Sequence, residues 1–355
     1  MRGVDKWLIK WLVWLMIVGL ATACSAGGRS TSEVPVVRLM THDSFDMSAE
    51  LIAAFEAETG IKVEVFKAGD GGEMLNKTIL AKDSPLADVL FGVDNTFLSR
   101  ALENDIFLAY KSPLLGDVND ALELDPQYRV SPVDFGDICL NYDVAWFERA
   151  GVPPPDSLQD LADPAYDGLT VVENAATSTP GLGFLLATIE TFGEDGYLDY
   201  WQQLVANDVL VVDGWEQAYY SYFTAASEGD RPIVVSYATS PVAEVYFAEE
   251  TLATAPTAAV LTDGTCFRQI EFIGILKGTP VEEQARQLVD FLLDQAFQED
   301  IPLKMFVFPA NETAQLPEVF QEYGHAANRP AQMTPERIAA NREAWIQAWT
   351  NVVLR

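Results

Sequence analysis

Histidine, cysteine and the recurring motifs of catalytic sites are scarce in this chain. Among 355 residues there are two histidines and three cysteines, and His42 and His325 lie far apart. No Cys/His cluster has the spacing of a zinc site. No Walker loop or G-x-S-x-G nucleophile motif is present, and Gly181-Leu182-Gly183 is too short for a dinucleotide fingerprint. The sequence therefore gives no support to hydrolytic, redox or nucleotide chemistry.

The chain also lacks an apolar run long enough to cross a membrane. The apolar run at residues 11–23 has about 13 residues, whereas a bilayer core of roughly 30 Å needs about 20. Basic residues precede this run and small residues end it, which is typical of a secretory signal peptide over residues 1–23. We therefore expect the body of the protein to lie outside the cytoplasm.

Cys24 follows the small residues at once, as in a bacterial lipobox, although leucine stands one place further upstream than usual. We expect Cys24 to be lipidated, so that residues 24–34, which are small and polar, form a flexible tether to the membrane. Ordinary cleavage without lipidation, or an uncleaved anchor helix, are the alternatives.

Basic residues are few. Lys and Arg number 22 against 53 Asp and Glu, which gives a formal net charge of −31. A surface this acidic repels nucleic acid and anionic lipid, and its field favours cationic solutes. A surface selected for solubility would have the same composition, so the charge by itself names no ligand.

The chain does contain a regular alternation of strand-like and helix-like segments. About 330 residues remain after the signal peptide, which is more than one typical domain and suggests two. In the first half, strands are predicted at 36–40, 61–65 and 88–91, and helices begin near Ser48, Gly72 and Asn95. In the second half, strands are predicted at 138–142, 169–172, 209–212, 233–237 and 267–276, and helices at 181–192, 215–226, 281–293 and 335–353.

This alternation predicts an α/β fold with parallel strands, whose ligands bind beyond the carboxyl ends of the strands. Polar turns stand at those ends. They are Thr41-His42-Asp43-Ser44, Gly69-Asp70-Gly71 and Gly92-Val93-Asp94-Asn95. We therefore expect a binding site at this edge of the sheet.

Several segments of the second half suit a binding cleft. Ser178-Thr179-Pro180-Gly181 places hydroxyls and free N–H groups at the start of a helix, which suits an anion or a hydroxyl group but also ordinary N-capping. Trp215, Tyr219 and Tyr220 offer flat faces for a heteroaromatic cation, or they pack in the core. Tyr237-Ala238-Thr239-Ser240 adds an aromatic and hydroxyl cluster at a strand end. Asp70, Asp94 and Glu271 are carboxylates near strand ends or inside a strand, where structural pairing is the alternative.

Taken in order, these segments resemble the thiamine-binding proteins of ABC transporters. The matching segments are Thr41-His42-Asp43-Ser44-Phe45, Gly69-Asp70-Gly71, Gly92-Val93-Asp94-Asn95, Asp134-Phe135-Gly136, Thr177-Ser178-Thr179-Pro180-Gly181-Leu182-Gly183, Gly214-Trp215-Glu216-Gln217-Ala218-Tyr219, Ser236-Tyr237-Ala238-Thr239-Ser240-Pro241 and the closing helix from Thr334-Pro335-Glu336 to Trp349. Each is weak alone, but together they follow the family's order over nearly the whole mature chain.

The resemblance implies a two-lobed type II periplasmic-binding-protein fold with crossing hinge strands. We expect lobe 1 over 35–137, lobe 2 over 138–265, a return to lobe 1 over 266–308, and C-terminal helices over 309–355 packed on lobe 2. It also implies a monomer without cofactor or catalytic activity that captures thiamine or a thiamine phosphate for an ABC permease. The residues it assigns to the ligand are Asp70, Gly71, Ser178, Thr179, Trp215, Tyr237, Ala238, Thr239 and Ser240, and we add His42, Asp94 and Tyr219.

Three positions depart from the family's aromatic pattern. His42 stands where a tyrosine is common, Ala243 replaces a second ligand-stacking tyrosine, and Phe306 stands near a position that is usually tryptophan. Because the aromatic walls are altered, a phosphate ester or the pyrimidine precursor of thiamine remains an alternative ligand.

The two remaining cysteines admit two interpretations. In an oxidising compartment Cys139 and Cys266 can form a disulfide, which we expect because both stand near a predicted lobe crossing. Thiaminases share the overall fold, so the competing possibility is an enzyme that uses one of these cysteines as nucleophile with Glu271 as base. A third possibility is the same fold with another solute, such as ferric ion, for which Tyr219 and Tyr220 are candidates, or a polyamine.

Overall fold

The computed structural model describes residues 34–355, so the predicted signal peptide, Cys24 and most of the predicted tether lie outside the described residues. Strands and helices alternate along Pro35–Arg355, which form one unit. The strands are β1 (Val36–Thr41), β2 (Lys62–Lys67), β3 (Val89–Asp94), β4 (Phe107–Leu108), β5 (Ser131–Asp143), β6 (Thr170–Glu173), β7 (Leu210–Val212), β8 (Ile233–Tyr237), β9 (Thr257–Ala259), β10 (Phe267–Leu276) and β11 (Phe308–Pro309).

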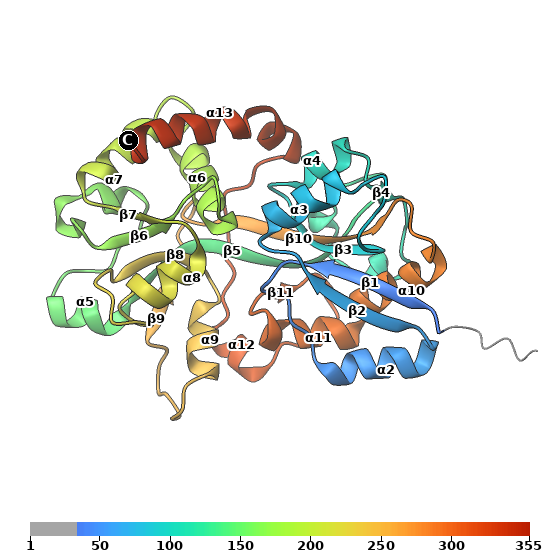
Figure 1. Cartoon of the computed structure of the whole chain (residues 1–355). Helices are drawn as coiled ribbons and strands as arrows, with labels where there is room; N and C mark the ends of the chain where they lie inside the picture. Colours follow the sequence, from blue (N-terminus) through green and yellow to red (C-terminus); the bar gives the residue numbers. More distant parts are fainter. Residues whose placement is uncertain (1–33) are drawn as a thin grey trace, which may run out of the picture. The chain divides into compact units, whose positions relative to one another are not determined.

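The α-helices surround these strands (Figure 1). They are α2 (Ala49–Thr59), α3 (Gly71–Leu80), α4 (Leu98–Glu103), α5 (Val144–Ala150), α6 (Thr179–Phe192), α7 (Tyr197–Ala206), α8 (Trp215–Gln217), α9 (Ser240–Tyr246), α10 (Glu282–Leu293), α11 (Gln295–Lys304), α12 (Glu318–Tyr323) and α13 (Pro335–Val353). None of the helices within 34–355 is both long and apolar enough to span a membrane.

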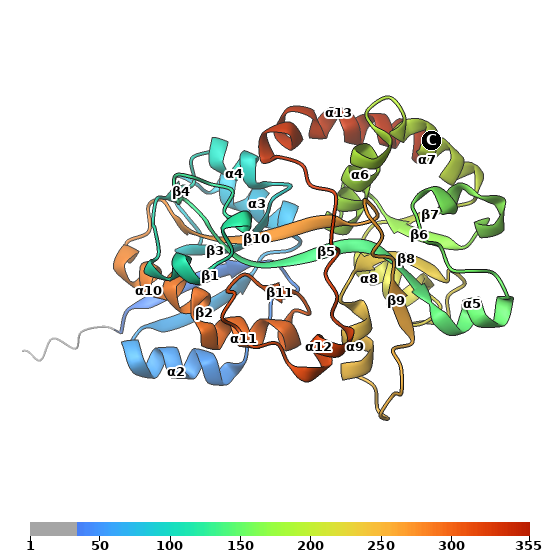
Figure 2. The same cartoon turned by 180° about the vertical axis from the view of Figure 1, so that it is seen from behind.

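The main strands pair in the order β2-β1-β3-β10-β5-β8-β6-β7. β1, β2 and β3 are parallel, as are β6, β7 and β8, whereas β5 and β10 are antiparallel to each other and to their outer neighbours. Figure 2 shows β5 and β10 passing between the two groups of helices. These two long strands therefore join two α/β lobes.

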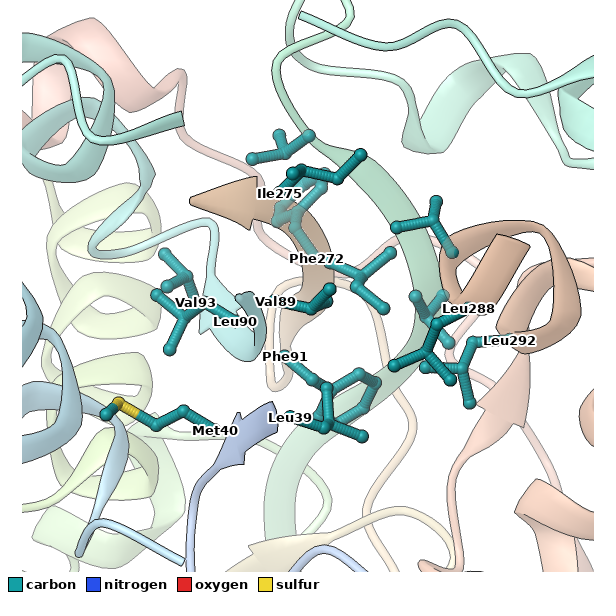
Figure 3. Packing of buried hydrophobic residues seen from close by; sticks show 14 of the residues in the cluster. Leu39, Met40, Val89, Leu90, Phe91, Val93, Phe272, Ile275, Leu288 and Leu292 are labelled. Atoms are coloured by element: carbon teal, nitrogen blue, oxygen red, sulfur yellow. The ribbon is translucent and has the colours of Figure 1, made fainter. Parts of the chain in front are cut away.

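Each lobe has its own hydrophobic core. The first core takes residues from 37–133 and 270–310, and β1, β3, β10 and α10 supply the side chains labelled in Figure 3. The second core takes residues from 138–267 and from α13, which contributes Ile338, Trp345 and Trp349. Along β5 the change of core falls between Val133 and Ile138, and along β10 between Phe267 and Ile270.

The helix α13 belongs to the second core but also reaches the first lobe. It packs against α7 and against α4, and Figure 1 shows it lying across the top of both groups of helices. The bounds of α13 predicted from the sequence are correct. The Thr334 hydroxyl caps the first turn, as predicted, by accepting a hydrogen bond from the Arg337 N–H at 3.3 Å.

The helix predicted at 215–226 is wrong in the structure. Only Trp215–Gln217 is α-helical, and a wider π-type turn follows over Ala218–Tyr222. This turn places both Tyr219 and Phe223 in a small core with Val171, Val212 and Val234 of the sheet. At the end of this turn the Tyr222 carbonyl accepts a hydrogen bond from the Arg231 N–H instead of from a following helical turn.

Candidate functional site

A cavity of about 520 Å³ lies where loops of the two lobes face each other. From the first lobe it is lined by the turn after β1 and the start of α3, and from the second by the starts of α6 and α8 and the end of β8. Six residues proposed from the sequence line it together: His42, Asp70, Ser178, Thr179, Trp215 and Tyr237. Its volume suits a small organic molecule.

The starts of α3 and α6 are fixed by short polar caps. The Asp70 carboxylate caps α3 by accepting a hydrogen bond from the Gly71 N–H at 2.7 Å. Ser178 caps α6, with its Oγ 3.5 Å from the nitrogen of Gly181. Only glycine fits at 181, because a Cβ there would lie 2.6 Å from the carbonyl oxygen of Glu173. This close approach seats α6 on the end of β6, so that its positive N-terminal end lines the cavity.

Trp215 forms an aromatic wall of the cavity. Its indole N–H donates to the Ser236 hydroxyl at 2.8 Å, which fixes the plane of the ring. Tyr219 stacks on it with ring centroids 5.1 Å apart and an interplanar angle of 28°, and Tyr220 meets its edge at 5.5 Å. A flat cation in the cavity can therefore stack against a ring that is already held in place.

Beneath the aromatic wall a chain of polar contacts links the lobes. The Tyr237 hydroxyl donates to Gln269 Oε1 at 3.0 Å, and Gln269 Nε2 lies 3.4 Å from Glu271 Oε1. His42 Nε2 lies 3.2 Å from the same Glu271 oxygen, an ion-pair distance without the alignment of a hydrogen bond. Gln269 lines the cavity but is absent from the residues proposed from the sequence. Asp43, Ser44 and Glu216, which belong to the segments quoted above, also line it.

These contacts set the charges of the buried groups. Burial is the largest influence on the pKa of His42 and lowers it, but the contact with Glu271 and the charges of Glu271, Asp70 and Asp94 together raise that pKa above 6.5. Burial is likewise the largest influence on the pKa of Glu271 and raises it, but His42, Asp134 and Gln269 together lower it. Asp134 lies opposite Glu271 in the β5–β10 pairing, and burial together with the Glu271 charge raises the pKa of Asp134 well above its ordinary value. The group therefore carries its proton on Asp134 and its negative charge on Glu271.

Four carboxyl groups act together on Tyr237. Burial is the main reason why the pKa of Tyr237 is well above 10, and the charges of Glu271, Asp70, Asp94 and Glu173 raise it further. These groups come from both lobes and from segments far apart in the sequence. Of these four groups only Asp70 lines the cavity, and its negative charge favours a cationic ligand there.

The structure places the other six proposed residues away from the cavity wall. Gly71 faces Thr179 across the lobes, where a Cβ would lie 3.7 Å from its hydroxyl. Tyr219 supports Trp215 from behind and donates to Glu244 at 2.7 Å. The remaining four are turned inward by local hydrogen bonds or core packing. Asp94 accepts from Thr96, Ala238 packs beside the disulfide, Thr239 donates to the Phe306 carbonyl, and Ser240 pairs with Ser236.

Asp94 makes the stability of the unliganded protein depend on pH. Burial raises its pKa to about 6, although hydrogen bonds from Thr96 lower it. Between about pH 4 and 6 the unfolded chain loses this proton while the folded chain keeps it, so the free energy of unfolding falls as pH rises. We expect Asp94→Asn, which cannot ionise, to raise that free energy by about 2 kcal/mol at pH 7.5 and to leave it unchanged below pH 4.

Guanidinium denaturation of the ligand-free protein at both pH values measures this difference. Asp263→Asn, at an exposed carboxyl, is the matched control and should not change the free energy of unfolding at either pH. Equal stability of Asp94→Asn and the wild type at pH 7.5 would contradict the assignment.

The described residues do not assemble a metal centre. Residues 34–355 contain no group of three or more His, Cys, Asp or Glu side chains that could hold a metal ion. Tyr219 and Tyr220, considered above for ferric ion, do not line the cavity, because the Tyr219 hydroxyl is turned to Glu244 and Tyr220 is 60% exposed.

Cys139 and Cys266 are joined by a disulfide, and neither residue lines the cavity. Their Cα atoms are 4.3 Å apart, and both residues are fully buried. Cys139 belongs to β5 and Cys266 directly precedes β10, so the bond ties the two crossing strands together on the side of the second lobe. A disulfide offers no thiolate, which leaves the considered enzyme mechanism without its nucleophile.

Known proteins resemble this chain in sequence and in fold. The model of the bacterial extracellular solute-binding proteins matches residues 84–326. The thiamine-binding periplasmic protein of Salmonella typhimurium is 30% identical over 328 residues, which cover 90% of this chain and 94% of that protein.

Solved structures of periplasmic binding proteins have a similar fold. A periplasmic thiamin-binding protein has a TM-score of 0.79 and 28% identity, and the match covers 92% of this chain and 99% of that one. The iron-bound HitA of Pseudomonas aeruginosa has a TM-score of 0.74 at 18% identity, with 90% and 99% covered, and shows the fold alone. The two-lobed α/β architecture is thus that of the type II periplasmic binding proteins, as predicted, and this chain belongs to the family of bacterial extracellular solute-binding proteins.

Proposed function

We propose that the protein binds thiamine, or a phosphate ester of thiamine, in the cavity between its lobes. The observation that carries this proposal is that the fixed Trp215 face and the Asp70 carboxyl group line the same cavity, next to Tyr237. Thiamine offers the complementary chemistry, because its thiazolium ring is flat and permanently positive. Its aminopyrimidine can exchange hydrogen bonds with a carboxylate such as Asp70, and its hydroxyethyl arm can meet the Ser178–Thr179 end of α6. The relatives named as thiamine-binding add support.

Thermal melting of the purified protein tests this proposal. A ligand at 100 times its Kd should add about 2.7 kcal/mol to the free energy of unfolding, which corresponds to a rise of about 4 °C in the melting temperature of a protein of this size. The panel contains thiamine, its two phosphate esters, the aminopyrimidine precursor, ferric citrate and spermidine. A shift with iron or spermidine, and none with thiamine or its esters, would overturn the proposal in favour of another solute.

We further propose that the protein acts in capture and delivery, as a monomer. The lobes would close around the ligand by a hinge motion at β5 and β10 and then dock on an ABC permease. No catalytic step is assigned, since both cysteines lie in the disulfide. Incubation with thiamine and aniline checks this, because a thiaminase would release the free thiazole and this protein should not.

The lipid anchor at Cys24 remains part of this proposal. The motif at residues 20–24 supports it, since small residues lead directly into the cysteine. A lipidated protein should fractionate with membranes and a Cys24→Ser variant should not. Equal membrane association of the two proteins would argue for an uncleaved anchor helix instead.

A further inference from the structure

Among the described residues that line the cavity, His42 is the only one that can carry a positive charge. Its ring rests against Gly92, where a Cβ would lie 2.2 Å from the His42 Cδ2 atom, and its centroid is 5.7 Å from that of the Phe91 ring. Its Nε2 atom lies 3.2 Å from Glu271 Oε1, and both side chains are only 12% exposed. The imidazole is therefore held in one position beside a carboxylate, at the surface of the cavity.

The same cavity is lined by four carboxyl groups. They belong to Asp43, Asp70, Asp213 and Glu216. Asp43 accepts a hydrogen bond from the Gly69 N–H at 3.1 Å, and Asp70 caps α3. Lys67 of β2 donates to the Asp43 carbonyl at 2.9 Å but does not line the cavity. The positive charge of His42 is thus surrounded by negative groups that would also attract a cationic ligand.

Three further acids form a row across neighbouring strands next to His42. Asp94 of β3 and Asp134 of β5 each lie opposite Glu271 of β10, one on either side, and all three side chains are buried. The hydroxyl of Tyr237 on β8 keeps its proton, because burial and the nearby acids raise its pKa well above 10. The guanidinium of Arg342 on α13 is attracted by Asp94 but does not line the cavity. Within residues 34–355, the imidazolium is therefore the positive charge that faces this row from the cavity.

We infer that His42 is positively charged in the ligand-free protein and loses its proton when a cationic ligand binds. The physical reason is that two positive charges in one cavity repel each other, so the bound cation favours the neutral imidazole. The proton passes from the imidazolium to the solvent, and the charge of the ligand replaces it among the carboxyl groups. The pKa of free His42, which the neighbouring acids raise above 6.5, agrees with this charge.

This inference rests on the proposed function only for the positive charge of the ligand. Because binding releases a proton, the affinity for the ligand should increase as the pH rises. The competing explanation is a structural ion pair, in which His42 stays charged and holds the turn after β1 against β10 whether or not a ligand is bound.

Proton NMR of the histidine rings separates the two explanations. The sequence contains only His42 and His325, so two sets of ring signals are expected, and a His325→Gln variant assigns them. The His42 signal should titrate at a lower pH in the thiamine complex than in the free protein. His325 is exposed and should titrate at the same pH in both states. An unchanged titration of His42 would show that it keeps its proton and would overturn the inference.

Isothermal titration with thiamine in buffers of different ionisation enthalpy counts the released protons. At pH 6.5 more than half of the free protein carries the His42 proton. The wild type should therefore release up to about one proton more per ligand than His42→Gln, and its affinity should rise by up to about tenfold more per pH unit. His325→Gln should match the wild type. Asp94→Asn removes the other group that titrates near this pH and should leave the effect of His42→Gln in place.

The possible results lead to separate conclusions. Equal proton release by the wild type and His42→Gln would overturn the inference. If His42→Gln fails to fold, the NMR titration of the wild type decides the question. A wild type that binds thiamine without releasing a proton removes this inference only, whereas one that binds neither thiamine nor its esters removes the proposed function as well.

Discussion

A Trp215→Ala variant should bind thiamine with an affinity about 100-fold lower than that of the wild type. A cation–π contact in a desolvated site contributes about 2 kcal/mol or more, and the stacked apolar area is lost with it. The expected loss is large because this ring is fixed before the ligand arrives. Tyr219 stacks behind it and Ser236 accepts its N–H. Isothermal titration and the thermal shift with thiamine measure the effect. The unliganded protein should lose only about 1–2 kcal/mol of stability, because the indole is partly exposed and one hydrogen bond is removed.

Tyr220→Ala is the matched control for this experiment. Tyr220 lies on the same turn and touches the edge of Trp215, but it is 60% exposed and does not line the cavity. Its removal should change the affinity less than threefold. If Trp215→Ala retains the full thermal shift, Trp215 is not part of the binding site and the proposed ligand position is wrong.

The Cys139→Ala/Cys266→Ala double variant should be the least stable of the proteins considered. The disulfide closes a loop with a sequence separation of 127 residues, and a loop of that length restricts the unfolded chain by about 4–5 kcal/mol in the chain-entropy model. Because the loop contains most of the second core, the unfolding transition of that lobe should move to lower denaturant concentration. Thiamine affinity should change little, since neither cysteine lines the cavity.

Denaturation with and without reductant checks this prediction. Dithiothreitol should lower the midpoint of the wild type toward that of the double variant and should leave the double variant unchanged. A double variant within 1 kcal/mol of the wild type, or a wild type whose midpoint ignores the reductant, would mean that the bond contributes little to stability.

The sequence alone determined the parts of this protein that depend on local pattern. A long apolar run located β10, and the Thr334-Pro335 cap marked where α13 begins. The polar turns after β1 and β2 were recognisable because parallel strands present their carboxyl ends at one edge. The resemblance to the thiamine-binding family, rather than local pattern, selected five of the six proposed ligand residues that line the cavity, and His42 was added to them.

Only the tertiary structure decided which polar side chain reaches the cavity and which is used within the protein. Ser178 and Ser240 are both small hydroxyl residues at helix starts, but Ser240 is turned to Ser236 whereas Ser178 lines the cavity. The alternation of side chains along a strand predicts the face of the sheet on which Gln269 lies. It does not predict which side chains from other segments surround Gln269. Arg342 approaches α3 and α6 only because α13 packs across both lobes. The physical reason is that the sequence pattern of a helix or strand depends on residues that are neighbours along the chain. The charge and burial of a side chain in the cleft depend on segments that come together only when both lobes have folded.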